Sequence, residues 1–299
     1  MTAPAGALVD ATSRKRLYVI IPRICTVLAS AIILFSQEFW LVAASQVATA
    51  VAGAAIGSAV SGMTLGMVRQ SGFNRQNGRN QAFNHAGNVV GAALSGYLGW
   101  QFCWAAVFGL VALIGILSIV SVLMIPADAI DDREARGLRS EKEGDGKASG
   151  FRVLVESKPL LILAACLAFF HLGNGAMLPL FGLAVVGAKQ GNPAIFVAET
   201  IVIAQAVMIV ASIIAMRMAE KEGYWLVLLI SFVALPIRGL IATHLITNWC
   251  VYPVQILDGV GAGLQSAAVP GLVARSLNGT GRVNVGQGAV MTVQAGPLG

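Results

Sequence analysis

Residues 102–125 read FCWAAVFGLVALIGILSIVSVLMI and contain no charged side chain. A bilayer core requires about 20 apolar residues per helix, so this stretch is long enough to cross a membrane. Eight other apolar stretches along the chain have a similar length and composition. The sequence therefore predicts nine spans: residues 17–36, 41–68, 81–98, 102–125, 159–183, 195–218, 224–243, 250–273 and 283–299.

The composition of the whole chain agrees with a membrane protein. Of the 299 residues, 57% are hydrophobic and 11% are charged, whereas roughly a quarter of the residues of soluble domains are charged. A chain with so few charges cannot cover a water-facing surface, which argues against a soluble enzyme and a nucleic-acid-binding module. The predicted fold class is all-α, a polytopic bundle of transmembrane helices.

The connections between the predicted spans alternate between basic and nearly uncharged segments. Basic loops stay on the cytoplasmic side of a membrane. This rule predicts a multi-pass protein of the cell (plasma or inner) membrane with a cytoplasmic N-terminus. The basic connections contain Arg14, Lys15, Arg16, Arg69, Arg75, Arg79, Arg217, Lys221, Arg275, Arg282 and the long segment 126–158.

The segment 126–158 is the one long polar stretch of the chain, and it mixes both charge signs. It is interpreted as a cytoplasmic linker with a short surface helix around residues 131–138. The linker would separate an N-terminal half-bundle of about four helices, residues 1–125, from a C-terminal one of about five helices, residues 159–299.

Similar glycine and arginine spacings in the two halves favour an internal repeat. Gly53, Gly57 and Gly66 precede Arg69 much as Gly259, Gly263 and Gly271 precede Arg275. Repeated halves that run in the same sense predict a pseudo-twofold axis along the membrane normal, as in transporters with a central site.

Pairs spaced G-x-x-x-G also predict close helix packing. These pairs are Gly53/Gly57, Gly62/Gly66, Gly87/Gly91 and Gly259/Gly263.

No pattern in the sequence indicates catalysis, a cofactor or a bound metal. The four cysteines are far apart, the three histidines are scattered, and a phosphate-binding G-x-x-x-x-G-K-[ST] is missing. We therefore expect neither an enzyme nor ATP-driven transport by this chain alone.

Polar and ionisable residues at membrane depth are costly, so each is a candidate for a substrate or proton pathway. Arg238 and Asp258 have similar predicted depths, and an ion pair between them would either line a cavity or fix helix docking. Glu199 is either a proton carrier or a snorkelling interfacial carboxylate, and His171 is either a titrating or a packing histidine. The full set is Arg238, Asp258, Glu199, His171, Asn174, Asn84, His85, Asn88, Gln205, Gln255 and Gln265.

Two segments resemble the major facilitator superfamily (MFS). Residues 6–16, GALVDATSRKR, are similar to its signature G-x-L-x-D-x-x-x-R-[KR]-R, and residues 78–91 resemble the start of its fifth helix. The first resemblance implies a conformational latch in which Asp10 bonds to nearby arginines, formed by Gly6, Asp10, Arg14, Lys15 and Arg16. A basic cluster that only enforces sidedness is the alternative.

The resemblance implies a secondary active transporter that moves a small organic solute by alternating access, with the lipid bilayer as its surroundings. Proton coupling and a drug-efflux type of cargo are further expectations. Counted against twelve helices of the family, the chain would begin at the third helix and end in the eleventh, as an apparently truncated member. The alternative function is a non-transporting membrane remnant or scaffold protein.

Overall fold

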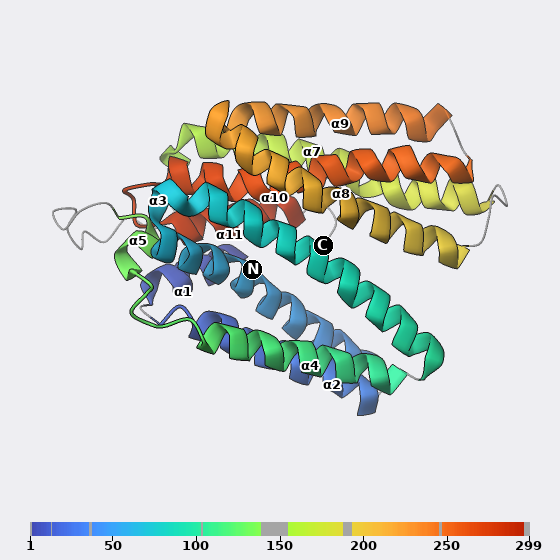
Figure 1. Cartoon of the computed structure of the whole chain (residues 1–299), viewed down its shortest axis with the longest axis horizontal. Coiled ribbons are helices and arrows are strands. Elements are labelled where there is room, and N and C mark those ends of the chain that lie inside the picture. Colours follow the sequence, from blue (N-terminus) through green and yellow to red (C-terminus); the bar gives the residue numbers. More distant parts are fainter. Residues whose placement is uncertain are drawn as a thin grey trace. The chain divides into compact units, whose positions relative to one another are not determined.

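The computed structural model describes residues 2–12, 14–35, 38–102, 104–138, 155–187, 193–244 and 247–295, and this part of the chain is helical without a strand. Figure 1 shows the helices in chain order. They are α1 (Thr2–Ala11), α2 (Leu17–Phe35), α3 (Phe39–Gln101), α4 (Trp104–Leu123), α5 (Asp132–Arg136), α7 (Lys158–Gly187), α8 (Pro193–Lys221), α9 (Tyr224–His244), α10 (Val251–Ser276) and α11 (Val283–Ala295), with a 3-10 turn at Asn248–Cys250.

Seven of these helices are long and apolar enough to cross a membrane, namely α2, α3, α4, α7, α8, α9 and α10. The predicted class of membrane helical bundle is therefore confirmed. Two of the nine predicted spans, 41–68 and 81–98, share the 63-residue helix α3, in which Arg69 alone has a non-helical backbone (φ 57°). The ninth falls on α11, which has 13 residues. The exact number of spans stays a prediction.

The chain forms two compact units that are each built from several segments. Unit 1 contains Met1–Ser71, Ala92–Leu161 and Val273–Thr292, and unit 2 contains Gly72–Gly91, Ile162–Leu272 and Val293–Gly299. The predicted half-bundles 1–125 and 159–299, and the pseudo-symmetry between them, remain predictions.

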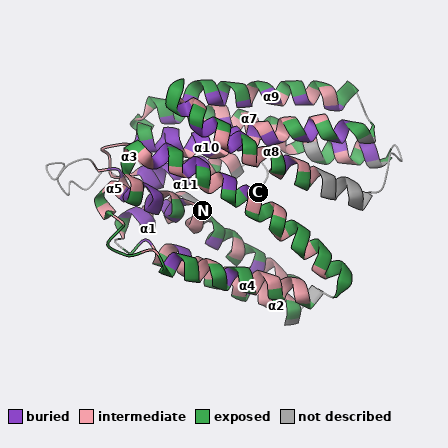
Figure 2. Cartoon of the chain, in the orientation of Figure 1, coloured by how far each residue is buried: buried purple, intermediate pink, exposed green. Residues whose placement is uncertain are grey.

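In unit 1, α2 packs against α4, and the two lie side by side in Figure 1. A cluster of buried apolar side chains joins the start of α2 to α1, α3 and α4; it consists of Val9, Val19, Ala59, Met63 and Val122. Most residues of α2 and α4 outside this cluster are exposed or half-buried (Figure 2). Because both helices are apolar, the exposed side chains suit contact with lipid rather than water.

In unit 2, α10 is the most buried of the candidate spanning helices. In its most apolar stretch 61% of the residues are buried, compared with 11% in α2. Its glycines allow this close packing. A Cβ atom on Gly263 would lie 2.7 Å from the Cβ of Ala211 in α8, and one on Gly259 would lie 2.7 Å from the Ala204 carbonyl oxygen. The pair Gly259/Gly263 therefore packs as predicted.

Other predicted glycine pairs behave differently. Gly57, Gly62 and Gly66 are closely packed in unit 1, whereas no described atom lies within 4 Å of a Cβ on Gly53, Gly87 or Gly91. The prediction that Gly87/Gly91 makes a close helix contact is wrong for the described residues.

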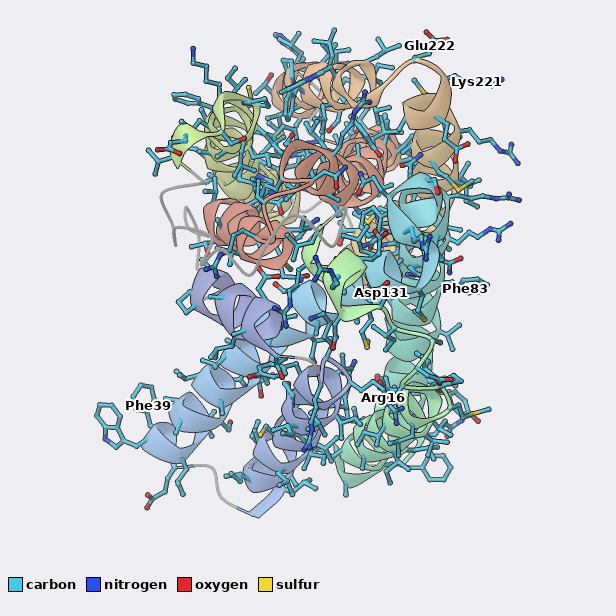
Figure 3. The ribbon with its side chains drawn as sticks, turned by 90° about the vertical axis from the view of Figure 1, so that its left-hand side faces the viewer. Arg16, Phe39, Phe83, Asp131, Lys221 and Glu222 are labelled. Carbon is cyan, nitrogen blue, oxygen red and sulfur yellow. The ribbon has the colours of Figure 1, made fainter. Side chains whose placement is uncertain are left out.

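Large apolar side chains also extend outward from α3. Phe39 is 73% exposed and Phe83 is 77% exposed, and Figure 3 shows both side chains pointing away from the helix that carries them. Such exposure on a helix long enough to span a membrane is expected where lipid is the solvent.

Candidate functional site

A buried ion pair joins three helices of unit 2. Arg238 of α9 donates through Nη1 to Asp258 Oδ1 of α10 and through Nη2 to Asn174 Oδ1 of α7. Its Nε also lies 3.1 Å from the Met177 sulfur. The Arg238 side chain is 2% exposed and the Asp258 side chain is 15% exposed. A guanidinium with partners on three sides holds α7, α9 and α10 in one arrangement.

The sequence predicted the pairing of Arg238 with Asp258, and the structure adds Asn174 as a third member. The other polar residue on the same helix, His171, is not part of this cluster. Its Nδ1 lies 2.9 Å from the carbonyl oxygen of Leu167, one turn earlier in α7. The structure therefore gives Asn174 and His171 different surroundings, although one helical turn separates them.

A second polar cluster in unit 2 surrounds His85 of α3, which is 7% exposed. Its Nδ1 lies 2.9 Å from Gln205 Oε1 of α8, and its Nε2 lies 3.3 Å from Ser266 Oγ of α10. The Ser266 hydroxyl donates to the Gly263 carbonyl at 2.9 Å. Both ring nitrogens therefore have an oxygen partner, so a proton can be held on either side of the ring.

Other predicted residues of unit 2 lie outside these clusters. Gln265 Nε2 donates to Ser231 Oγ at 2.8 Å, which ties α10 to α9. Gln255 is 1% exposed, and its Nε2 has no hydrogen-bond partner among the described residues. Asn84 and Asn88 are exposed on α3. The side chain of Glu199 lies outside the described part of the structure.

The predicted latch residues Gly6 and Asp10 lie in unit 1, against the start of α11. The Asp10 carboxylate accepts hydrogen bonds from Asn284 Nδ2 at 2.7 Å and from the Val285 backbone N–H at 2.9 Å. Gly6 approaches the Asn284 backbone so closely that a Cβ atom would overlap the carbonyl oxygen. A carboxylate beside the first N–H groups of a helix is favoured by the helix dipole.

Asp10 is 3% exposed, and burial raises the pKa of its carboxyl from 3.8 to about 6, although the bonds from Asn284 and Val285 oppose this shift. Lys15 is also buried and donates to the carbonyls of Val9 (3.2 Å) and Thr12 (2.9 Å). Burial lowers the pKa of Lys15, and the nearby Asp132 carboxylate, 3.7 Å away, opposes this.

The expected partners of Asp10 were Arg14 and Arg16, and the structure shows others. In the described part of the chain, neither arginine has an ion pair with Asp10. Asn284 and Val285 replace them because α1 docks on α11.

The short helix predicted near residues 131–138 is present as α5, and it is docked rather than free. Asp131 caps it by accepting from the backbone N–H groups of Arg133 (2.9 Å) and Glu134 (3.2 Å). Ala135 is fully buried, and its carbonyl accepts from Asn284 Nδ2 at 2.9 Å. The same Asn284 amide thus joins α1, α5 and α11.

The sequence profile of the Major Facilitator Superfamily matches residues 1–297 of the chain. The chain belongs to this superfamily. Two curated proteins named uncharacterized MFS-type transporters, from the CDC 1551 and H37Rv strains of Mycobacterium tuberculosis, are each 34% identical to it over 290 residues. The match covers 97% of this chain and 69% of each relative.

Membership of the superfamily makes the protein a multi-pass membrane transporter, with the lipid bilayer and a small solute as its partners. It also favours transport over catalysis. Among the described residues, no group of three or more His, Cys, Asp or Glu side chains is placed to hold a metal ion.

Three polar residues of this MFS protein were not among the residues predicted from the sequence. Asn74 Nδ2 donates to the Met216 carbonyl at 2.8 Å, and Asn77 Nδ2 donates to the Ala267 carbonyl at 3.0 Å, so both tie the part of α3 that belongs to unit 2, residues 72–91, to α8 and α10. Arg23 lies inside the predicted first span and is half-buried. Asn74 and Asn77 are three residues apart and therefore share one face of a helix. This signal was missed because residues 69–80 were predicted to form a loop.

Proposed function

We propose that this MFS protein is a secondary active transporter that moves a small organic solute by alternating access. It would lie in the cell (plasma or inner) membrane with its N-terminus in the cytoplasm. The observation that carries the proposal is the buried ion pair between Arg238 of α9 and Asp258 of α10, since both helices are candidate membrane spans. Charges at such depth are costly and mark solute or ion pathways.

The geometry of the pair supports a role in binding. Arg238 is enclosed by Asp258, Asn174 and Met177, while Asp258 keeps part of its surface exposed. A proton or a cationic group of a solute that reached Asp258 would compete with Arg238 for the carboxylate. Loss of the ion pair would weaken the connection among α7, α9 and α10 and so couple binding to helix movement.

We further propose that the contact of Asp10 with Asn284 and Val285 is the latch that stabilises one conformation during the cycle. Its two sides belong to α1 and α11, and a hydrogen bond between an amide and a carboxylate breaks and reforms readily. Arg14, Lys15 and Arg16, which directly precede α2, would support this latch by placing positive charge near the Asp10 carboxylate.

Proton coupling and a drug-like cargo are the finer parts of the proposal. Asp258 and His85 are the proton carriers that the contacts support best, because Asp258 is partly exposed and both His85 ring nitrogens have oxygen partners. His171 and Glu199 are further candidates. A carrier of protons must exchange its proton with either side of the membrane in turn.

The test uses the full chain in proteoliposomes with an imposed proton gradient and ethidium, an organic cation, as the first solute. We expect gradient-dependent ethidium movement for the wild type, at least a tenfold lower rate for Asp258→Asn, and an unchanged rate for the exposed control Asp128→Asn. An Asp258→Asn protein with the wild-type rate and pH dependence would contradict a role for this carboxylate. Failure of folded wild-type protein to move any of a panel of organic solutes would contradict transport itself.

A further inference from the structure

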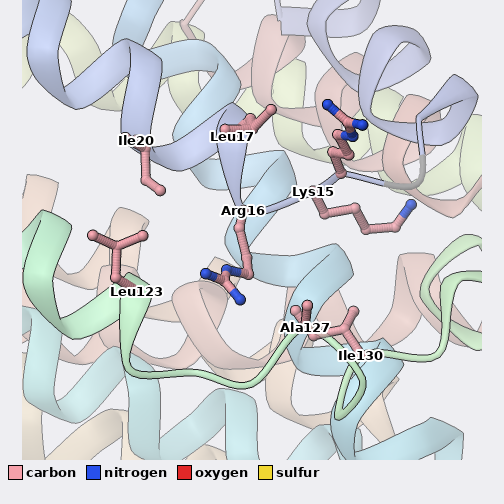
Figure 4. A pocket seen from close by; sticks show the side chains of 8 residues that line it. Lys15, Arg16, Leu17, Ile20, Leu123, Ala127 and Ile130 are labelled. Atoms are coloured by element: carbon pink, nitrogen blue, oxygen red, sulfur yellow. The ribbon is translucent and has the colours of Figure 1, made fainter.

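A pocket of about 340 Å³ lies in unit 1, where α2 begins and α4 ends (Figure 4). Its described lining contains three basic residues, five apolar residues and no acidic one: Arg14, Lys15, Arg16, Leu17, Ile20, Leu123, Ala127 and Ile130. Because α2 and α4 are both candidate spans, we expect their ends to lie where the hydrocarbon core meets the lipid headgroups.

The basic side chains of this pocket have different surroundings. Lys15 is buried and uses its ammonium group on the carbonyls of Val9 and Thr12. Figure 4 shows the Arg16 guanidinium in the space between Leu123 and Ala127. Arg16 is half-buried and Arg14 is exposed, and in the described part of the chain neither forms an ion pair with a carboxylate. Two positive charges thus remain available beside apolar walls.

A third cation lies further along α2. Arg16, Ile20 and Arg23 are spaced i, i+4 and i+7, so they share one face of the helix. The Nε of Arg23 is buried and has no hydrogen-bond partner among the described residues. Side chains on a helix lean toward its N-terminus, which for Arg23 is the end with the pocket. A guanidinium in a membrane span is costly, so an anion near Arg23 would stabilise it.

We propose that this pocket binds the headgroup of an anionic phospholipid. Arg14 and Arg16 would bind the phosphate group, and Arg23 would help to neutralise its negative charge from the side of the hydrocarbon core. The apolar residues Leu17, Ile20 and Leu123 would contact the part of the acyl chains nearest the headgroup. The planar guanidinium matches a phosphate with two parallel hydrogen bonds. A free phosphate ion has the same polar chemistry, but it would leave the five apolar lining residues uncovered, so a lipid fits the pocket better.

The experiment measures lipid binding to the full chain by native mass spectrometry in detergent. Phosphatidylglycerol and phosphatidylcholine with identical acyl chains are added in parallel, with and without excess inorganic phosphate. We expect the wild type to retain phosphatidylglycerol in preference to phosphatidylcholine. Arg16→Gln should bind phosphatidylglycerol about fivefold more weakly, the usual effect of one basic side chain at a membrane surface. Arg75, one of the exposed arginines of α3, provides the control Arg75→Gln, which should bind as the wild type does.

Two further variants separate lost binding from lost folding. Arg16→Lys keeps the charge and should retain most of the preference for phosphatidylglycerol. Ala127→Trp fills the pocket and leaves the arginines in place, and it should lose the lipid while keeping the helical circular dichroism spectrum of the wild type. Equal phosphatidylglycerol binding by wild type and Arg16→Gln would overturn the proposal. Displacement of the lipid by inorganic phosphate would also overturn it, because the ligand would then be a soluble anion.

Discussion

Asn284 donates a hydrogen bond to the Asp10 carboxylate at 2.7 Å although 274 positions of sequence separate the two residues. The same side-chain nitrogen also donates to the Ala135 carbonyl. One buried amide therefore joins α1, α5 and the start of α11. This junction links the first residues of the chain to nearly the last, and it contains a titratable group.

The first prediction concerns the pH dependence of this junction. Burial raises the pKa of Asp10 to about 6 from 3.8, so the docked state binds the proton more tightly than a solvated Asp10 does. The stabilising contribution is complete below pH 3.8 and is lost as the pH rises through about 6; the difference is about 3 kcal/mol. Hydrogen–deuterium exchange, corrected for its intrinsic pH dependence, should show α1 losing protection between pH 5 and pH 7.

Matched variants identify the group responsible. Asp10→Asn should remove the pH dependence of α1 protection, whereas the exposed control Asp128→Asn should retain it. Lys15 faces Asp10, and Asp132 and Arg136 in turn face Lys15, so Lys15→Met tests the contribution of this neighbouring charge. An Asp10→Asn protein with the same pH profile as the wild type would assign the transition to another group.

The second prediction concerns the docking of α5. Ala135 is fully buried, and a Cβ atom on Gly66 of α3 would lie 2.9 Å from the Ala135 Cβ. Ala135→Leu should therefore displace α5, at a cost of about 1–3 kcal/mol for overpacking. Trypsin should then cleave after Arg133 and Arg136 several-fold faster than in the wild type. Ala129→Leu, at an exposed position of the same segment, should leave the rate unchanged; equal rates for both variants would mean that α5 does not need this contact.

Sequence alone could predict the spanning helices because the signal is local. An uncharged run such as residues 102–125 has no soluble alternative, and α4 occupies Trp104–Leu123 as expected. The Arg238–Asp258 pair was also accessible, since two opposite charges at similar depth on consecutive helices have few other partners. These inferences need only hydropathy, charge and helix length.

The contacts that depend on distant segments were not accessible. Nothing near Asp10 in sequence indicates that its donors are Asn284 and Val285. The basic residues Arg75 and Arg79 favoured a loop over residues 69–80, although this segment contains no proline and is helical apart from Arg69, so Asn74 and Asn77 were missed. Arg23 was overlooked because the apolar residues around it dominate the average hydropathy of the span.

The third prediction uses two glycines with opposite surroundings. A Cβ atom on Gly263 would lie 2.7 Å from the Ala211 Cβ and 2.9 Å from the Met208 Cα, so Gly263→Ala should force α8 and α10 apart. We expect a loss of about 1–3 kcal/mol in the free energy of unfolding. Gly87→Ala is the control, because no described atom lies within 4 Å of the added Cβ, and its higher helix propensity should stabilise the protein by up to about 1 kcal/mol.

Unfolding in a titration with sodium dodecyl sulfate would measure both glycine variants. If Gly87→Ala lost as much stability as Gly263→Ala, the exposed face of α3 at Gly87 would have to be packed against another helix, and the difference between the two glycine pairs would disappear.

The fourth prediction separates a structural role of the Arg238–Asp258 pair from a role in transport. Asp258→Asn leaves the Arg238 cation, 2% exposed, without its counter-ion, whereas Arg238→Gln leaves a carboxylate that is 15% exposed. Breaking a buried pair costs about 3–5 kcal/mol. We therefore expect both single variants to lose stability in thermal unfolding, and Asp258→Asn to lose more because its orphaned charge is the more buried.

The double variant Arg238→Gln/Asp258→Asn contains no unpaired charge and should recover most of the lost stability, since neutral replacements of a buried pair are often tolerated. If the pair only docks α9 on α10, ethidium transport should recover together with stability. If Asp258 exchanges its partner with a solute or a proton, the double variant should remain at least tenfold slower than the wild type despite its recovered stability. The proposal for Asp258 requires this second outcome, because a neutral amide cannot release and rebind a cation during the cycle.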